Sequence, residues 1–454
     1  MAIETRTDAA TLARAFMQML SEDNVITAEN ERIRYAVDGI TPATVLFPQG
    51  PEQVSDILAF AHAENLAVIP WGAGTSIGLG NPPRRADLVI SLARLNRVLE
   101  HEPADLTATV QAGIPLGTLQ AYLARAGQWL PLDPPVAERT TIGGLLAANI
   151  SGPQRLGYGT LRDLLIGLRV VGDDGTLFKG GAKVVKNVAG YDLPKLFIGS
   201  LGTLGIIVEA TFKLLPLPKA RNTLVARYGA IGEATDAAGR ALIVGLTPVA
   251  LEVLDRGVAQ AVGLPADGWT LCARFAGIPA AVERQMREME HLARSIGAAG
   301  TSMLQGSAED HLWQRIADLP VALAPTNSSW VKAKISVLPT RLPQVAEAAI
   351  RVTQANGLQA ATWLRAGTGL AYVIIQEGET GAKAVARLGA TIASLREQIA
   401  TLGGTMALEE GPVALKVSDA VWGPPRSDFR VMQAIKQKFD PKGILNPGRF
   451  VGGL

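Results

Sequence analysis

The stretch Pro70–Gly80, with the sequence PWGAGTSIGLG, constrains the fold of this 454-residue chain more than any other. The apolar run Leu66–Ile69 leads straight into it and is typical of a short buried strand. Four glycines within nine residues let several backbone N–H groups approach a bound anion, and Thr75 and Ser76 add two hydroxyl groups. The pattern predicts a loop that cradles a phosphate or pyrophosphate at the end of a strand.

A Rossmann loop and a plain surface turn are the alternatives for this stretch. A Rossmann fingerprint that starts at Gly72 needs glycine at position 77, where the chain has Ile77, and a helix directly after it. Pro82 and Pro83 stop such a helix. The loop would therefore hold its ligand through backbone donors without the helix of an ordinary dinucleotide site. A glycine-rich turn without a ligand fits this stretch equally well when it is taken by itself.

The charge balance and the content of cysteine and histidine exclude several classes of protein. A formal net charge of +2 gives no indication of binding to nucleic acid or to an anionic membrane. The single cysteine, Cys272, lies in an apolar run that predicts a buried, inert thiol, and one cysteine excludes an internal disulfide or an iron–sulfur cluster held by this chain alone. None of the four histidines lies within five residues of another, so we expect no histidine-based metal site.

The sequence also predicts where the protein resides. The first residues carry Glu4 and Arg6 and no apolar core, which is unlike a signal peptide. No apolar run reaches the roughly 18 residues that a membrane-spanning helix needs. We therefore expect a cytoplasmic protein without a transmembrane segment, or one held on the inner membrane through its partners.

The chain divides into two parts that differ in glycine content and in the expected order of strands and helices. A strand at 44–48, a helix from Pro51 and the strand before the glycine loop predict a β-α-β unit, which puts the loop at the carboxyl end of a strand. After Pro218 glycine becomes rarer and strands alternate with longer helices. This second part predicts a mostly antiparallel sheet with helices on one face.

Three segments carry a family resemblance: Pro70–Ser76, Thr141–Gly144 and Gly199–Ile207. In this order and spacing they resemble the FAD-binding domain of flavoproteins of the vanillyl-alcohol oxidase type, which have the para-cresol methylhydroxylase (PCMH) fold. Lys186–Leu193 and the end of the chain, with Phe439–Pro441 and Leu445–Arg449, are similar to the FAD-binding subunit of bacterial glycolate oxidases. The resemblance covers most of the chain and is weakest between about residues 221 and 360.

The resemblance implies an α+β fold in which a two-subdomain, PCMH-type FAD-binding domain is joined to an α/β cap domain with a mostly antiparallel sheet. The expected division is an N-terminal helical segment at 1–35, the FAD-binding domain at 36–218, the cap domain at 219–412 and a C-terminal segment at 413–454 that packs back on the FAD domain.

The resemblance also implies that the loop at 70–80 cradles the FAD pyrophosphate, with the backbone of Ile207 at the adenine. The flavin is expected to be non-covalent, because the loop offers no His, Cys or Tyr for attachment. Thr141 and Ser151 could instead cap helices, and Gly143 and Gly144 could be packing glycines. The residues expected to bind the cofactor are Trp71, Gly72, Ala73, Gly74, Thr75, Ser76, Gly80, Pro134, Thr141, Gly143, Gly144, Ser151, Gly152 and Ile207.

The segment Arg365–Tyr372 departs from the family pattern. In the related catalytic hydroxy-acid dehydrogenases it carries a histidine at each end and binds a divalent metal beside the flavin. A third metal histidine of those relatives falls at Glu410 here. Since arginine offers no lone pair to a metal, the resemblance implies that this metal site is lost, and we expect no metal.

Three functions stay open at this point. In the first, the chain is the FAD-binding subunit of a glycolate (2-hydroxy acid) oxidase or dehydrogenase complex, and its flavin exchanges electrons with a flavoprotein partner and an iron–sulfur subunit. In the second, it is a stand-alone, metal-independent dehydrogenase in which Arg365 grips the carboxylate of a small hydroxy acid and Tyr372 or Glu410 acts as base. Arg365 could instead pair with Glu410 or contact a partner. In the third, the chain is a non-catalytic scaffold.

Lys183 and Lys186 could compensate the flavin's anionic face or be solvated.

Overall fold

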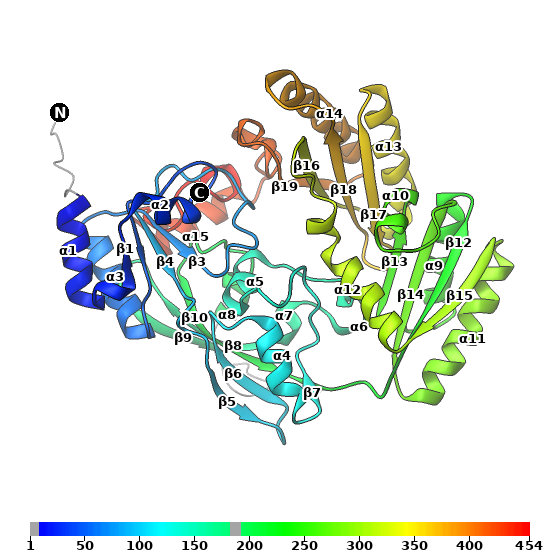
Figure 1. Ribbon diagram of the computed structural model, residues 1–454, viewed down its shortest axis with the longest axis horizontal. Coiled ribbons are helices and arrows are strands. Elements are labelled where there is room, and N and C mark those ends of the chain that lie inside the picture. The colour runs from blue at the N-terminus through cyan, green and yellow to red at the C-terminus, as the bar shows by residue number, and fades with distance from the viewer. Residues whose placement is uncertain (1–8, 182–191) are drawn as a thin grey trace.

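The computed structural model describes residues 9–181 and 192–454 and forms two lobes (Figure 1). The first part of the chain, blue through cyan to the green of β10 in Figure 1, builds one lobe, and the later green-to-orange part builds the other. The last residues, in red, return to the first lobe. Lys183 and Lys186, with most of the motif Lys186–Leu193, lie outside the described residues.

The first sheet forms the β-α-β unit that leads into the glycine loop. Its order is β1-β2-β4-β3, and β4 pairs in parallel with both β2 and β3. β4 is buried on both faces, as expected for a central parallel strand. Helix α3 begins with Pro51 in its first turn and buries one stripe in the hydrophobic core of this lobe. The elements are β1 Val25–Ile26, β2 Thr44–Leu46, β3 Val68–Trp71, β4 Leu88–Ser91, α1 Ala9–Leu20, α2 Glu29–Arg32 and α3 Pro51–Ala63.

The second sheet of this lobe is antiparallel, with the order β5-β6-β10-β8-β9. Both sheets share one core, which joins Phe16 and Leu58 to Leu168 and Phe212. The strands are β5 Val98–Glu102, β6 Thr107–Gln111, β8 Leu165–Val171, β9 Leu177–Gly181 and β10 Ile206–Lys213, and β7 Gln128–Trp129 pairs with β11 Leu215–Pro216. The helices are α4 Leu116–Ala124, α5 Ile142–Ala148, α6 Arg155–Tyr158, α7 Leu161–Leu164 and α8 Leu193–Phe197.

In the described part of the chain, eight antiparallel strands form the sheet of the second lobe, in the order β15-β12-β14-β13-β17-β18-β16-β19. This confirms the mostly antiparallel cap sheet. The strands are β12 Ala220–Tyr228, β13 Ala250–Leu254, β14 Trp269–Gly277, β15 Gly300–Gln305, β16 Ser329–Ser336, β17 Gln359–Arg365, β18 Leu370–Glu377 and β19 Thr405–Glu410.

Helices cover both faces of the cap sheet, so the expectation of helices on one face is wrong. One core packs α9 Ile231–Ile243, α11 Pro279–Ser295, α13 Leu342–Ala355 and α14 Ala382–Thr401 on one face. A second core packs α10 Arg256–Ala261 and α12 Ser307–Ala322 on the other. Helix α12 lies between the cap sheet and the first lobe, where Asp318 Oδ1 accepts a hydrogen bond of 2.7 Å from Val136 N. Cys272 is buried in the second core, and burial raises the pKa of its thiol.

No helix in residues 9–181 and 192–454 has the length and apolar character needed to cross a membrane. Helix α15 Phe429–Phe439 follows the cap lobe and lies on the first lobe in Figure 1.

A buried ion pair joins α12 to the cap sheet. Arg274 Nη2 donates to Glu309 Oε2 at 2.9 Å, and the side chains are 5% and 1% exposed. Thr223 Oγ1 donates to Glu309 Oε1, and Trp313 Nε1 donates to Thr223 Oγ1 at 2.7 Å. Such a pair is stable only while both partners and their remaining hydrogen bonds are present.

We expect Glu309→Ala to lower the free energy of unfolding by about 3–5 kcal/mol, because it removes the buried partner of the Arg274 guanidinium and leaves only the half-exposed Asp310, at 3.8 Å. The measurement is urea unfolding followed by circular dichroism. The matched control is Glu283→Ala, which removes an exposed pair with Arg287 on α11 and should change stability by less than about 0.5 kcal/mol. Equal losses in the two variants would contradict this assignment.

Candidate functional site

The glycine loop follows β3 and presents free backbone donors. Among the described residues, no backbone N–H of residues 72–76 donates a hydrogen bond. Gly72 lies so close to Thr141 that a Cβ there would sit 2.2 Å from the threonine Oγ1. Gly74 and Gly80 have φ of +72° and +103°, values that favour glycine. The loop is therefore shaped by its glycines into a concave run of N–H groups, which suits an anion.

Two buried cations hold the other side of the loop. Arg449 Nη2 donates to the carbonyls of Ile77 and Leu79, each at 2.5 Å. Lys416 Nζ donates to Gly78 O at 2.6 Å and pairs with Asp38 at 2.7 Å. These cations fix the carbonyls of residues 77–79, and the neighbouring N–H groups of residues 72–76 have no partner among the described residues.

Two cavities follow the loop. The smaller, of about 400 Å³, contains six of the predicted cofactor residues and is lined by Pro70, Trp71, Gly72, Leu92, Thr141, Gly143, Gly144, Ala147, Gly202, Gly205, Ile206 and Ile207. The larger, of about 690 Å³, lies between the lobes and is lined by Thr75, Ser76, Leu79, Pro135, Val136, Thr140, Ile150, Ser151, Pro320, Val321, Lys332, Lys334, Arg365, Tyr372, Glu409 and Glu410. The same loop borders both cavities.

Five predicted cofactor residues lie outside the two linings: Ala73, Gly74, Gly80, Pro134 and Gly152. Gly80 packs on the Arg449 carbonyl, where a Cβ would lie 2.7 Å from the oxygen, and Gly152 packs on Asp133 in the same manner. These two glycines permit close backbone approach around the site.

The alternative roles of Thr141 and Gly143 are present in the structure. Thr141 is the N-cap of α5, and its Oγ1 accepts a hydrogen bond of 3.3 Å from Gly144 N. Gly143 packs on Ala112, with a hypothetical Cβ 3.0 Å from that residue's Cβ. Ser151 caps no described helix; its Oγ accepts a hydrogen bond of 3.1 Å from Arg155 Nη1. Capping and packing do not prevent these residues from lining a cavity, because Thr141 and Gly143 do both.

Arg365 lies at the wall of the larger cavity and is 6% exposed. Its Nη1 donates to Ser151 O across the lobes at 2.8 Å, and its Nε lies 3.6 Å from Glu252 Oε1. Its guanidinium stacks over the ring of Tyr372 at 4.9 Å. Within the described chain Nη2 has no hydrogen-bond partner, so one edge of the guanidinium is available in the cavity.

Tyr372 and Glu410 are also engaged by neighbouring side chains. The Tyr372 ring stacks on Trp363 at 5.1 Å with an angle of 10° between the planes. Glu410 pairs with Lys332 at 2.5 Å. The expected ion pair between Arg365 and Glu410 is therefore wrong. The sheet order explains this, because β18 and β16 separate β17 from β19 and the cross-strand neighbour of Arg365 is Glu252.

Three further charged residues of the larger cavity, Lys332, Lys334 and Glu409, were not predicted from the sequence. Lys332 and Lys334 alternate along β16, so both point to one face of an otherwise apolar strand. Two lysines on one face of a buried strand indicate a polar site, and this spacing was the available signal. No group of three His, Cys, Asp or Glu side chains that could hold a metal ion occurs among the described residues.

Two buried carboxyl groups lie behind Arg365. Burial raises the pKa of Asp133 to about 6, although Arg365 lowers it and Gln154 N donates to this carboxylate at 3.0 Å. Burial raises the pKa of Glu252 to about 8, with Arg365 opposing the shift. Both oxygens of Glu252 are buried without a hydrogen bond. The protonated form of Glu252 is therefore favoured below about pH 8.

The residues of both cavities fit FAD. The free N–H groups at 72–76 suit the pyrophosphate, the glycine-lined smaller cavity suits the adenine end, and the larger cavity beside the cap sheet suits the flavin ring. Bound FAD would supply the redox chemistry, and the protein would supply binding and orientation.

Comparison with known proteins identifies the same cofactor. A family model described as "FAD binding domain" matches residues 42–181, and one described as "FAD linked oxidases, C-terminal domain" matches residues 217–450. The chain is 29% identical to glycolate oxidase subunit GlcD of Bacillus subtilis, covering 95% of each chain. It is 30% identical to D-2-hydroxyglutarate dehydrogenase of Xanthomonas citri, covering 90% of this chain and 89% of that protein.

The fold is also that of solved flavoprotein structures. p-Cresol methylhydroxylase with substrate bound superposes with a TM-score of 0.80 at 18% identity, covering 97% of this chain and 96% of that one. Together these findings confirm the FAD cofactor, the PCMH-type fold and the resemblance to glycolate oxidase subunits. Which of the subunits of such an oxidase this chain corresponds to stays a prediction.

We expect Gly72→Ala to weaken FAD binding about tenfold or more, because the new Cβ would collide with Thr141 Oγ1 and displace the start of α5. Titration of the FAD-free protein with FAD, followed by flavin fluorescence, measures the Kd. The control is Gly239→Ala on α9, where a Cβ meets nothing within 4 Å. That variant should keep its FAD affinity, and an unchanged Kd for Gly72→Ala would contradict the placement of the cofactor.

Glu252 makes stability depend on pH. The folded state retains a proton that the unfolded state releases between its pKa of 4.5 and about 8, so the free energy of unfolding falls as pH rises through this window. We expect Glu252→Gln to show a shallower fall between about pH 5 and pH 8, measured by urea unfolding. Glu283→Gln, at an exposed site, serves as control. Parallel slopes for all three proteins would exclude a proton on Glu252.

Proposed function

Because the chain belongs to the FAD-linked oxidases and is an FAD-dependent oxidoreductase, we propose that it is the FAD-binding subunit of a glycolate or related 2-hydroxy-acid oxidase complex. Its flavin would transfer electrons between a flavoprotein partner that holds the hydroxy-acid site and an iron–sulfur partner. Support for a subunit role comes from the relatives named glycolate oxidase subunit GlcD.

One observation carries this proposal. The two charged side chains expected to perform chemistry at the flavin already have partners in the protein, Arg365 with Ser151 O and Glu252, and Glu410 with Lys332. The Tyr372 ring is held between Arg365 and Trp363. A base that removes the hydroxyl proton of a substrate needs a lone pair free to reach it. Glu410 Oε1 is held by Lys332, and the flavin can exchange electrons with a partner without any base beside it.

A substrate site in this chain is the second candidate, and the charge of the larger cavity favours it. Its lining carries Lys332, Lys334 and Arg365 against Glu409 and Glu410, which leaves one positive charge in excess. The free edge of Arg365 suits a carboxylate. In this function Arg365 would hold the acid, and Tyr372 or Glu410 would act as base.

We also propose the four-part division at 1–35, 36–218, 219–412 and 413–454, a non-covalent flavin, and a cytoplasmic location or attachment to the inner membrane through partners. Separate hydrophobic cores in the two lobes support the boundary near residue 218, while residues of the first and last segments share the core of the FAD domain. The absence of His, Cys and Tyr from residues 70–80 supports the non-covalent flavin.

Anaerobic reduction of the purified, FAD-loaded chain separates the two candidates. We expect glycolate or D-lactate to leave the flavin bands unchanged in the isolated chain and to bleach them after co-purification with the iron–sulfur and flavoprotein partners. A chain that purifies without flavin and binds none would contradict both candidates.

The variant Arg365→Met tests the role of Arg365 in the same experiment, with Thr235→Val as its control. If the isolated chain bleaches with a hydroxy acid and Arg365→Met slows bleaching roughly tenfold to hundredfold, the second candidate holds and the electron-transfer proposal fails. Thr235→Val, on the cap surface away from both cavities, should leave the bleaching rate unchanged.

A further inference from the structure

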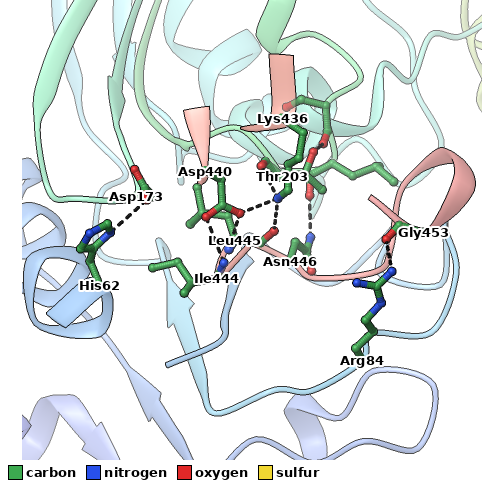
Figure 2. A network of polar contacts seen from close by, with 12 residues as sticks. His62, Arg84, Asp173, Thr203, Lys436, Asp440, Ile444, Leu445, Asn446 and Gly453 are labelled. Carbon is green, nitrogen blue, oxygen red and sulfur yellow. Dashed lines mark hydrogen bonds and ion pairs between the residues drawn. The ribbon is translucent and has the colours of Figure 1, made fainter. Parts of the chain in front are cut away.

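The segment after α15 lies against both loops that line the cofactor cavities. Figure 2 shows Lys436 among Thr203, Asp440 and Leu445. Its Nζ donates to Thr203 O at 2.8 Å and to Leu445 O at 3.0 Å, and it pairs with Asp440 Oδ2 at 2.5 Å. One ammonium group thus joins the helix, the following turn and the loop that precedes β10.

Asp440 fixes the turn that Lys436 holds. Its side chain is buried; Oδ1 accepts from Ile444 N at 3.0 Å and Oδ2 accepts from Leu445 N at 2.9 Å. Because the carboxylate receives these backbone bonds as well as the ammonium group, helix and turn form one rigid unit.

The turn then joins the first sheet. Val68 N donates to Ile444 O, and Asn446 N donates to Val68 O, each at 2.8 Å, so the segment adds a short parallel bridge beside β3. Asn446 Nδ2 donates to Leu201 O at 2.5 Å (Figure 2). Three residues later Arg449 binds the carbonyls of the glycine loop.

The same short segment therefore holds both cofactor loops. Lys436 and Asn446 bind carbonyls at 201–203, and Arg449 binds carbonyls at 77–79. The loops also touch, since a Cβ on Gly202 would lie 2.9 Å from Pro70 Cγ. A change in the segment would alter the spacing of the smaller cavity.

We propose that residues 436–449 form a clip that sets the spacing of the two loops and thereby retains FAD, with Lys436, Asn446 and Arg449 as positioning residues. The inference rests on the placement of FAD along these loops and not on the substrate or the partners. Linkage requires the reverse effect as well: FAD stabilises the docked clip, and the FAD-free protein releases it more readily.

Lys436 and Lys438 on α15 provide a matched pair of variants, since Lys436 is bonded and half-buried and Lys438 is exposed. We expect Lys436→Met to raise the Kd of the FAD-free protein for FAD roughly tenfold or more, and Asn446→Ala to raise it severalfold. Lys438→Met should stay within about twofold. Flavin fluorescence gives the Kd, and circular dichroism confirms that each variant is folded.

Limited trypsin digestion of the unmodified protein tests the linkage. Arg430 and Lys438 on α15 are exposed cleavage sites, and we expect saturating FAD to slow cleavage at both by about tenfold. If Lys436→Met fails to fold, the FAD affinity of Asn446→Ala tests the proposal in its place. Unchanged FAD affinity in the folded clip variants, or equal cleavage with and without FAD, would overturn the clip. Should Gly72→Ala also bind FAD normally, the placement of the cofactor fails as well.

Discussion

The buried guanidinium of Arg449 is the interaction on which the cofactor site depends. It is 2% exposed, and two of its nitrogens, Nε and Nη1, have no hydrogen-bond partner within the described residues. Burial lowers its pKa to about 10. Burying a charge with incomplete hydrogen bonding costs free energy. The position of this charge is explained by Nη2, which donates to the carbonyls of Ile77 and Leu79. The shape of the glycine loop is therefore maintained at the expense of global stability.

The cap sheet contributes a row of charged side chains to the face that meets the first lobe. Neighbouring strands place Glu410 beside Lys332, and Arg365 beside Glu252. Lys332 and Glu410 are joined by a hydrogen bond of 2.5 Å, whereas Arg365 Nε and Glu252 Oε1 lie 3.6 Å apart and neither Glu252 oxygen has a hydrogen bond among the described residues. The first pair lets the sheet carry charge at a buried interface, and the second leaves a buried carboxyl group unsatisfied. The cavity between the lobes is thus lined by groups whose orientation is set by strand register rather than by flexible loops.

Local patterns predicted the parts of the fold that depend on neighbouring residues. The glycine loop, its position after a strand and the prolines that end it are all visible in one stretch, and the three cofactor segments do lie together in space. The convergence of Arg365, Tyr372 and Glu410 on one cavity also followed from the resemblance. The partners of these three residues could not be predicted from the sequence, because side-chain pairing depends on the order of strands in the sheet. The second helix-covered face of the cap sheet, under α10 and α12, was not predicted for a similar reason. The amphipathic pattern of a helix does not say which side of a sheet the helix covers.

The return of the chain to the first lobe has a consequence for biosynthesis. A ribosome completes every strand of the two lobes before it makes residues 440–449, and domains fold in the order of synthesis. The bridge beside β3 and the cation under the glycine loop are then added last. Cofactor loading becomes a late step that follows synthesis of the whole chain, and a truncated product would lack both Ile444 and Leu445 of the first lobe's core and the side chains that close the site.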